Sequence, residues 1–217
     1  MILHKNIEQQ TEPWFKIKHG KIGGTTSKGL LVKGETLLME MLAAICEDFE
    51  PSNDGFENAA MLRGNQLEPV AIRELKSYTG IKFYDVGWIE HETIKLLGIS
   101  PDGLNCDLTI ACEVKCPSAK KHIEYIKGNC VPLEYINQCL HYFTVVDTLK
   151  TLHFASFRPE NKFKPLFVKK MTRQTEVNIG TKAKPVLKTV QEVVELVEEK
   201  AIQMEIDLKT ELENIKF

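Results

Sequence analysis

The sequence lacks an apolar run of the roughly 18 residues that a membrane-spanning helix needs. Its opening residues, Met1 to Asn6, have neither the apolar core nor the small-residue cleavage site of a secretory signal. We therefore expect a cytoplasmic protein with reduced thiols and no membrane association.

Cysteine pairs of the CxxC type are also absent, although the chain has 6 cysteines. Zinc modules usually present such pairs, and secreted disulfide scaffolds are shorter and richer in cysteine. The cluster Cys106, Cys112 and Cys116 leaves a zinc-organised interaction module as an outside alternative. Free thiols, buried or half-exposed, are the interpretation that we favour.

An excess of positive charge and a P-loop are missing as well. The formal net charge is −2, which argues against a protein that coats nucleic acid through bulk charge but allows a local basic groove. Gly23 and Gly24 are not followed by the Gly-Lys-Ser/Thr of a P-loop, so an ATPase is not indicated. The histidines show no ligand spacing such as HxH.

What is present is an alternation of helical and strand-like patterns over 217 residues, enough for one domain with a sizeable core. Apolar residues at gaps of three and four predict helices at about 35–49, 57–78, 133–146 and 185–217. Strands are predicted at about 81–90, 93–99, 108–115, 151–157 and 166–171. This order predicts an α/β or α+β fold with a central mixed β-sheet flanked by helices and a long C-terminal helix. We expect a single domain over 1–217, with its core at about 14–171.

Two short segments carry most of the chemical information. Residues 100–104 read Ser-Pro-Asp-Gly-Leu, and residues 112–117 read Cys-Glu-Val-Lys-Cys-Pro. Glu113 and Lys115 project from one face of their strand because alternate strand residues share a face, and a hairpin-like return can bring Asp102 beside them. Two such carboxylates repel each other unless a cation joins them. Mg²⁺ prefers oxygen ligands and keeps waters, one of which can become a nucleophile that Lys115 orients or deprotonates. This pattern predicts a metal site for phosphodiester hydrolysis.

Each segment also has a purely structural interpretation. Pro-Asp-Gly is a common turn, and Glu-Val-Lys could be the exposed face of an edge strand. The order of the two segments, on consecutive strand ends, favours the metal site over this alternative.

Together the two segments resemble the signature of the PD-(D/E)XK nuclease superfamily, in the form found in the YqaJ-like viral recombinase and phage lambda exonuclease family. Other segments resemble motifs of that family in the same order. They are the N-terminal segment from Trp14 to Thr25, the Gly-x-x-x-Glu motif ending at Glu68, and the Tyr-x-x-Gln motif from Tyr135 to Gln138, with Tyr142 after it. The resemblance spans about 14–158.

The resemblance implies a restriction-endonuclease-like core and a set of residue roles. Asp102, Glu113 and the backbone carbonyl of Val114 would bind the metal, and Lys115 would serve the attacking water. Glu68 would support the metal or the water from the edge of the site.

A further amide and a phosphate pocket are implied in the same way. Gln138 would orient the site from the following helix, and Lys18, Thr25 (or Thr26) and Ser100 would hold a terminal 5′-phosphate. Lys18 stands where the family often has Arg, and a lysine binds phosphate as a point charge without a bidentate fork. Without the resemblance, Glu68 and Gln138 would be ordinary helix-surface residues and Lys18 part of a solvated face. Trp14 is expected in the core rather than as a base-stacking platform.

The implied function is a Mg²⁺-dependent exonuclease, with Mn²⁺ as the alternative ion, that acts 5′→3′ on the ends of linear double-stranded DNA. It would generate single strands for phage-type recombination with a single-strand annealing protein, as a homo-oligomer (a trimeric ring), in a bacterial or phage-infected cell. An endonuclease or resolvase of the same superfamily remains an alternative that needs no phosphate pocket. A non-catalytic DNA-binding scaffold is a third, against which the intact set of Asp102, Glu113 and Lys115 argues.

Overall fold

The computed structural model describes residues 1–50, 59–181 and 183–216. In chain order the elements are β1 (Ile2–His4), α1 (Glu12–Lys18), α2 (Lys28–Val32), α3 (Gly34–Cys46), α4 (Ala59–Thr79), β2 (Trp88–Glu90), β3 (Gly98–Ile99), β4 (Gly103–Leu104), β5 (Ile110–Lys115), α5 (Ala119–Gly128), α6 (Leu133–Val145), β6 (Thr151–Phe157), β7 (Leu166–Thr172), β8 (Glu176–Asn178), β9 (Leu187–Thr189) and α7 (Val190–Ile215). None of the helices in these ranges is both long and apolar enough to cross a membrane.

The main sheet has the strand order β4-β5-β6-β7. It is mixed, because β5 runs parallel to β6 while the other neighbouring pairs are antiparallel. A parallel pair needs a long crossover, and here α5 and α6 supply it. The predicted α/β class with a central mixed sheet and flanking helices is confirmed.

The strands predicted at 81–90 and 93–99 are not strands of that sheet, although Tyr84 forms an isolated antiparallel bridge with Leu104 of β4. Their ends form β2 and β3, which pair with β1 in a separate antiparallel sheet. Both strands are shorter than predicted because His91 interrupts the chain with a turn. Its Nδ1 accepts the backbone N–H groups of Thr93 at 3.2 Å and Ile94 at 3.0 Å, so these amides cannot join a strand ladder.

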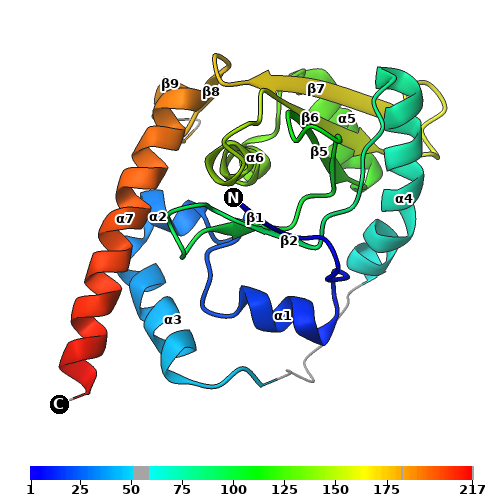
Figure 1. Cartoon of the computed structure of the whole chain (residues 1–217). Helices are drawn as coiled ribbons and strands as arrows, with labels where there is room; N and C mark the ends of the chain where they lie inside the picture. Colours follow the sequence, from blue (N-terminus) through cyan, green and yellow to red (C-terminus); the bar gives the residue numbers. More distant parts are fainter. Residues whose placement is uncertain (51–58, 182, 217) are drawn as a thin grey trace.

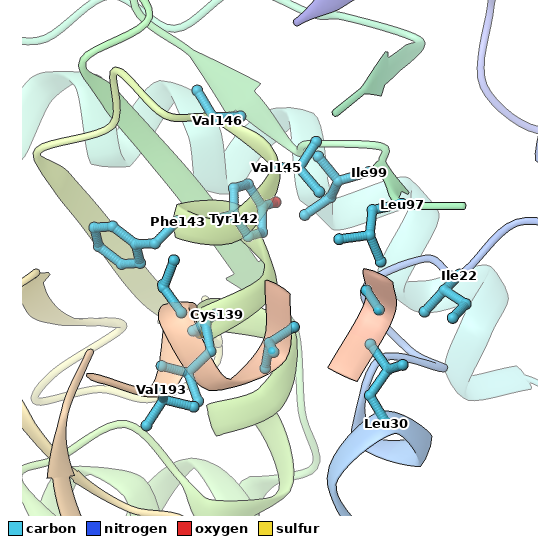
Figure 2. Close-up of a cluster of buried hydrophobic side chains, with 14 of the residues drawn as sticks. Ile22, Leu30, Leu97, Ile99, Cys139, Tyr142, Phe143, Val145, Val146 and Val193 are labelled. Carbon is cyan, nitrogen blue, oxygen red and sulfur yellow. The ribbon is translucent and has the colours of Figure 1, made fainter. Parts of the chain in front are cut away.

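Helix α6 runs between the two sheets, with α4 and α7 on opposite sides of it (Figure 1). Its residues from Cys139 to Val145 are all buried, since the helix is covered on every side. Figure 2 shows Cys139 of α6 near Val193 of α7, and Tyr142 near Ile99 of the β1-β2-β3 sheet. The core therefore joins both sheets through α6.

The long C-terminal helix is confirmed, but its predicted start at 185 is wrong. Residues Leu187–Thr189 form β9, which pairs with β8. Helix α7 begins only at Val190, after a capping box in which Thr189 Oγ1 accepts the N–H of Glu192 at 3.2 Å and Glu192 Oε2 accepts the N–H of Thr189 at 2.7 Å. Most of its predicted apolar face is buried: Val190, Val194, Val197, Ala201, Met204 and Leu208.

Several short elements had no prediction, namely α1, α2, α5, β1, β4 and β8. Helix α5 shows the reason, because its buried residues are His122 and Tyr125, which give no apolar periodicity. Helix α4 continues through Pro69, which does not divide it. The predicted start of that helix at 57 lies outside the described residues.

Candidate active site

The hairpin of β4 and β5 brings together Asp102, Glu113 and Lys115. Gly103 pairs with Cys112 across the hairpin, so Asp102 returns beside the middle of β5. Asp102 Oδ2 accepts the backbone N–H of Val114 at 2.6 Å. Glu113 is completely buried, and its Oε1 is in ion-pair contact with the Lys115 ammonium. The two segments that were separated in sequence thus meet at one point.

Burial and neighbouring charges together shift the pKa values of Asp102 and Lys115. Burial raises the pKa of Asp102 well above its usual range, and repulsion from Glu113 adds to the shift. For Lys115 burial acts to lower the pKa, but the attraction of Glu113 and Asp102 outweighs it and raises the pKa above its usual range. With these carboxylates as its neighbours, Lys115 is therefore a protonated cation and not a base.

Tyr142 of α6 supports both carboxylate residues, a role that our sequence reasoning missed. Its hydroxyl donates to Glu113 Oε2 at 2.7 Å and accepts the backbone N–H of Asp102 at 3.1 Å. Tyr142 lies four residues after Gln138, on the same face of the helix. That spacing was the available signal, but only the packing of α6 against β5 shows what the hydroxyl contacts.

Loss of this hydroxyl is expected to destabilise the fold. In Tyr142→Phe, Glu113 Oε2 remains buried but loses its donor, and we expect the free energy of unfolding to fall by about 1–3 kcal/mol. Urea unfolding measures the change. The control is Tyr84→Phe, whose side chain is 45% exposed and whose substitution should change stability by no more than about 0.5 kcal/mol. Equal stabilities of the two variants would show that the Tyr142 bond contributes nothing.

The residues present fit a divalent cation. Glu113 Oε1 is buried and, among the described residues, accepts no hydrogen bond of ordinary geometry and has the Lys115 ammonium as its close partner. The carboxylates of Asp102 and Glu113 and the Val114 carbonyl offer only oxygen, the ligand atom that Mg²⁺ and Mn²⁺ prefer. A cation here would also relieve the repulsion that raises the pKa of Asp102.

A second group of metal-ligating residue types, His91, Asp147 and Glu198, lies elsewhere. His91 Nδ1 accepts two backbone N–H groups, so in neutral imidazole the proton sits on Nε2. That nitrogen lies 3.9 Å from a carboxylate oxygen of each acid. A protonated nitrogen has no lone pair for a metal, so this group is a set of polar contacts and not the metal site.

Two cavities meet at Glu68 of α4. One, of about 590 Å³, is lined by Asp102, Asp85 and Glu68, and we name it the Asp102 cavity. The other, of about 570 Å³, is lined by Lys115, Lys121 and Glu68, and we name it the Lys115 cavity. Burial raises the pKa of Glu68, and Glu113 and Asp85 add to the shift while Lys115 opposes it. Glu68 therefore lines both cavities, the one beside Asp102 and the one beside Lys115.

Lys18 and Ser100 of the proposed phosphate pocket both contact the side chain of Trp14. Lys18 Nζ lies 3.4 Å from the centroid of the Trp14 ring, and burial lowers the pKa of Lys18 to about 8. Trp14 is half-buried, and its Nε1 donates to Ser100 Oγ at 2.6 Å. Ser100 Oγ in turn donates to the Gly87 carbonyl at 2.8 Å. The Ser100 hydroxyl thus fixes the Trp14 ring that carries Lys18.

Gln138 packs closely against Gly24, the residue before Thr25. A Cβ placed on Gly24 would lie 3.1 Å from Cγ of Gln138, so the loop before α2 passes directly over that amide. Thr25 follows Gly24 and is exposed. Gln138 therefore lies beside the loop that carries Thr25, and within the described residues it makes no direct hydrogen bond to the carboxylates.

The cysteine cluster does not form a metal site in the described ranges. Cys106 is exposed and contacts Asp107. Cys112 of β5 is buried, and its Sγ lies next to Gly103 of β4. Cys116 lines the Lys115 cavity. The three thiols lie in different surroundings and are not among the metal-ligating groups found there, which removes the support for a zinc-organised module.

The sequence and the fold were compared with known proteins. Residues 13–149 match the YqaJ-like viral recombinase domain. An alkaline exonuclease, LHK-Exo from Laribacter hongkongensis, is similar in structure with a TM-score of 0.74 and 27% identity, over 95% of this chain and 96% of that chain. Its complex with dAMP gives the same values. No curated protein matches.

A phage related exonuclease from Haemophilus somnus 129PT has a TM-score of 0.54 at 11% identity, over 90% of this chain and 96% of that chain, and shows likeness of fold alone. The domain match covers more than half of the chain and runs from the Trp14 segment past Tyr142. The protein therefore belongs to the YqaJ-like viral recombinase family, a family of the PD-(D/E)XK fold.

Proposed function

We propose that the protein is a metal-dependent deoxyribonuclease that degrades linear double-stranded DNA from its ends in the 5′→3′ direction. The observation that carries the proposal is the meeting of Asp102, Glu113 and Lys115 between two cavities. The likeness to an alkaline exonuclease over 95% of the chain supports the exonuclease class. It favours this class over an endonuclease or a scaffold of the same fold.

In this proposal Asp102, Glu113 and the Val114 carbonyl hold Mg²⁺ or Mn²⁺. When bound, the ion supplies Lewis acidity toward the phosphate and lowers the pKa of a water. Lys115 places a positive charge beside that position and orients the water. Glu68 accepts a hydrogen bond from water at the junction of the cavities. Tyr142 keeps Glu113 oriented through its 2.7 Å bond, and Gln138 orients the site from α6.

End recognition is assigned to the N-terminal segment. Lys18 supplies the charge for a terminal 5′-phosphate, and the exposed Thr25 hydroxyl supplies a donor. Ser100 acts mainly through Trp14, because its hydroxyl already donates to Gly87 and accepts from Trp14. Holding the terminal phosphate would set the next phosphodiester bond over the metal ligands.

The biological setting belongs to the proposal as well. A recombination nuclease of this kind would work in the cytoplasm with a single-strand annealing protein. A homo-oligomeric ring, a trimer, would enclose DNA and keep the enzyme on one strand. Single-domain organisation over 1–217 remains part of this proposal.

The test uses a linear duplex with a 5′-phosphate at one end and a covalently closed circle of the same sequence. With Mg²⁺ we expect loss of the phosphorylated strand and an intact circle, and with EDTA no cleavage. Nicking of the circle would identify an endonuclease. No cleavage of either DNA by folded protein would contradict a nuclease and favour a scaffold.

The preference for phosphorylated ends should depend on pH through Lys18. Since burial lowers the pKa of Lys18 to about 8, the side chain is charged at pH 7 and mostly neutral at pH 9. We expect the ratio of cleavage rates for 5′-phosphate and 5′-hydroxyl ends to fall about 10-fold over that range. Lys18→Arg, whose charge does not titrate, should keep the ratio constant.

Lys18→Gln should show the low ratio at both pH values, while Lys16→Gln on the exposed side of α1 should behave like the wild type. A ratio with the same pH dependence in Lys18→Arg as in the wild type would remove Lys18 from end recognition.

A further inference from the structure

The loop between β6 and β7 presents an unusually exposed aromatic side chain. Phe163 is 97% exposed, more than any other large hydrophobic side chain in the described ranges. A single exposed hydrophobic residue is ordinary on a protein surface. Phe163 differs from that case in the rigidity of its loop, in its charged neighbours and in its position beside the proposed active site.

The loop is held by hydrogen bonds at its tip. Asn161 Oδ1 accepts the backbone N–H of Phe163 at 3.1 Å and that of Lys164 at 3.0 Å. The Lys164 carbonyl accepts from Nε2 of His122, a completely buried residue of α5, at 2.8 Å. These bonds fix the backbone on both sides of the ring. Phe163 therefore points into solvent from a defined place, and not because the chain around it is loose.

Two arginines tie the loop to the rim of the Lys115 cavity. Arg158 donates to the Pro117 carbonyl at 3.0 Å, and Arg63 of α4 donates to the Cys116 carbonyl at 3.2 Å. Arg63 also binds both carboxylate oxygens of Glu160 at 2.8 Å. Figure 1 shows the β6–β7 connection beside α4. Because Cys116 and Pro117 line that cavity directly after Lys115, the loop is anchored at the cavity rim, while the lining itself is formed by other residues.

The charge around Phe163 suits a nucleic acid. Lys162 and Lys164 flank the ring, while the one acid of the loop, Glu160, is neutralised by Arg63. Grooves that take single-stranded nucleic acid combine lysines or arginines that follow the phosphates with aromatic rings on which bases stack. A protein partner would call for a wider apolar patch, whereas the residues next to this ring are charged.

We propose that Phe163 is a stacking platform for an unpaired base of the DNA strand that runs along the Lys115 cavity, with Lys162 and Lys164 beside its phosphates. This inference rests on the proposed function, because it assumes that the cavity takes DNA. It adds a contact outside the metal site that would keep one strand in place between successive cleavages.

The direct test replaces the ring by a fluorescent one. Phe163→Trp adds a third tryptophan to the 2 of the chain. We expect its fluorescence, measured as the difference from the wild type, to be quenched by a single-stranded oligonucleotide in Ca²⁺ buffer, because a stacked base quenches the indole. A change with protein concentration in the absence of DNA would instead mean a contact between copies and would overturn the proposal.

Affinity is the second readout. Phe163→Ala should raise the Kd for a duplex with a single-stranded tail about 5- to 30-fold, and Phe163→Tyr should restore it to within about 3-fold. The double variant Lys162→Ala with Lys164→Ala should reduce the salt slope of binding by about 2. The matched control is Tyr78→Ala at the end of α4, which is 70% exposed and should bind like the wild type.

The outcomes separate this inference from the proposed function. One outcome would contradict the stacking platform alone: the wild type cleaves linear DNA, Phe163→Ala binds DNA as tightly as the wild type, and DNA does not change the fluorescence of Phe163→Trp. The proposed nuclease function would then be retained. If the wild type binds no DNA, both are wrong. Since Phe163 is solvent-exposed, an unchanged thermal midpoint in Phe163→Ala will show that the fold is intact.

Discussion

Lys115→Ala is expected to lower the rate of duplex cleavage by about 10²- to 10⁴-fold, the range for losing a group that moves or holds a proton in the transition state. The physical reason is that Lys115 is the cation in contact with Glu113 and lines the cavity on that side of the site. Cleavage of a labelled linear duplex under single-turnover conditions measures the effect, with DNA affinity measured separately by anisotropy.

Lys120→Ala is the matched control. Lys120 lies on the same helix as Lys121, but its side chain is 87% exposed and it is not among the residues that line either cavity, so its loss should change the rate by less than about 3-fold because charges in solvent are screened. Lys115→Arg distinguishes a role of the positive charge from a role in proton donation, since arginine keeps the charge but cannot give up a proton. A Lys115→Ala enzyme that cleaves at the wild-type rate would exclude Lys115 from the chemistry.

Asp102→Asn is expected to have opposite effects on activity and stability. The amide keeps an oxygen that can accept the Val114 N–H, so the hairpin geometry is preserved. It removes one of two neighbouring carboxylates and with it a metal ligand, so we expect about 10³-fold or more loss of cleavage. Because the repulsion from Glu113 also disappears, the thermal midpoint measured in EDTA should rise by about 2–6 °C.

The sign of the stability effect depends on pH. Folding raises the pKa of Asp102 above its ordinary value of 3.8, so the folded chain binds a proton more tightly than the unfolded chain. The wild type consequently loses stability as the pH rises from about 4 through the raised pKa, while the variant does not. The two midpoints should agree below about pH 4 and differ most once the pH exceeds the raised pKa of Asp102.

Mg²⁺ provides an independent check of the same site. The ion should raise the midpoint of the wild type in a concentration-dependent way, because a ligand that binds only the folded state stabilises it. It should leave Asp102→Asn unchanged. Equal responses of the two proteins to Mg²⁺ would place the ion elsewhere. A lower midpoint for the variant in EDTA would show that Asp102 is not under repulsion.

The sequence by itself determined the parts of this protein that follow local rules. Alternation along a strand placed Glu113 and Lys115 on one face, and a Pro-Asp-Gly turn returned Asp102 to them. Apolar gaps of three and four residues predicted the buried face of α7 because a helix repeats with a fixed period. The order of the motifs along the chain indicated the family.

The tertiary structure decided what depends on contacts between distant residues. Residues 81–99 contribute to a second sheet because β1 pairs with β2 and β2 with β3. Strand β9 replaces the first turn of the expected helix because β8 pairs with it. The Tyr142 bond to Glu113 and the tie of Arg63 to Glu160 join positions 29 and 97 residues apart. The charge of Lys115 has the same origin, since burial and neighbouring charges set a pKa and no spacing along the chain encodes them.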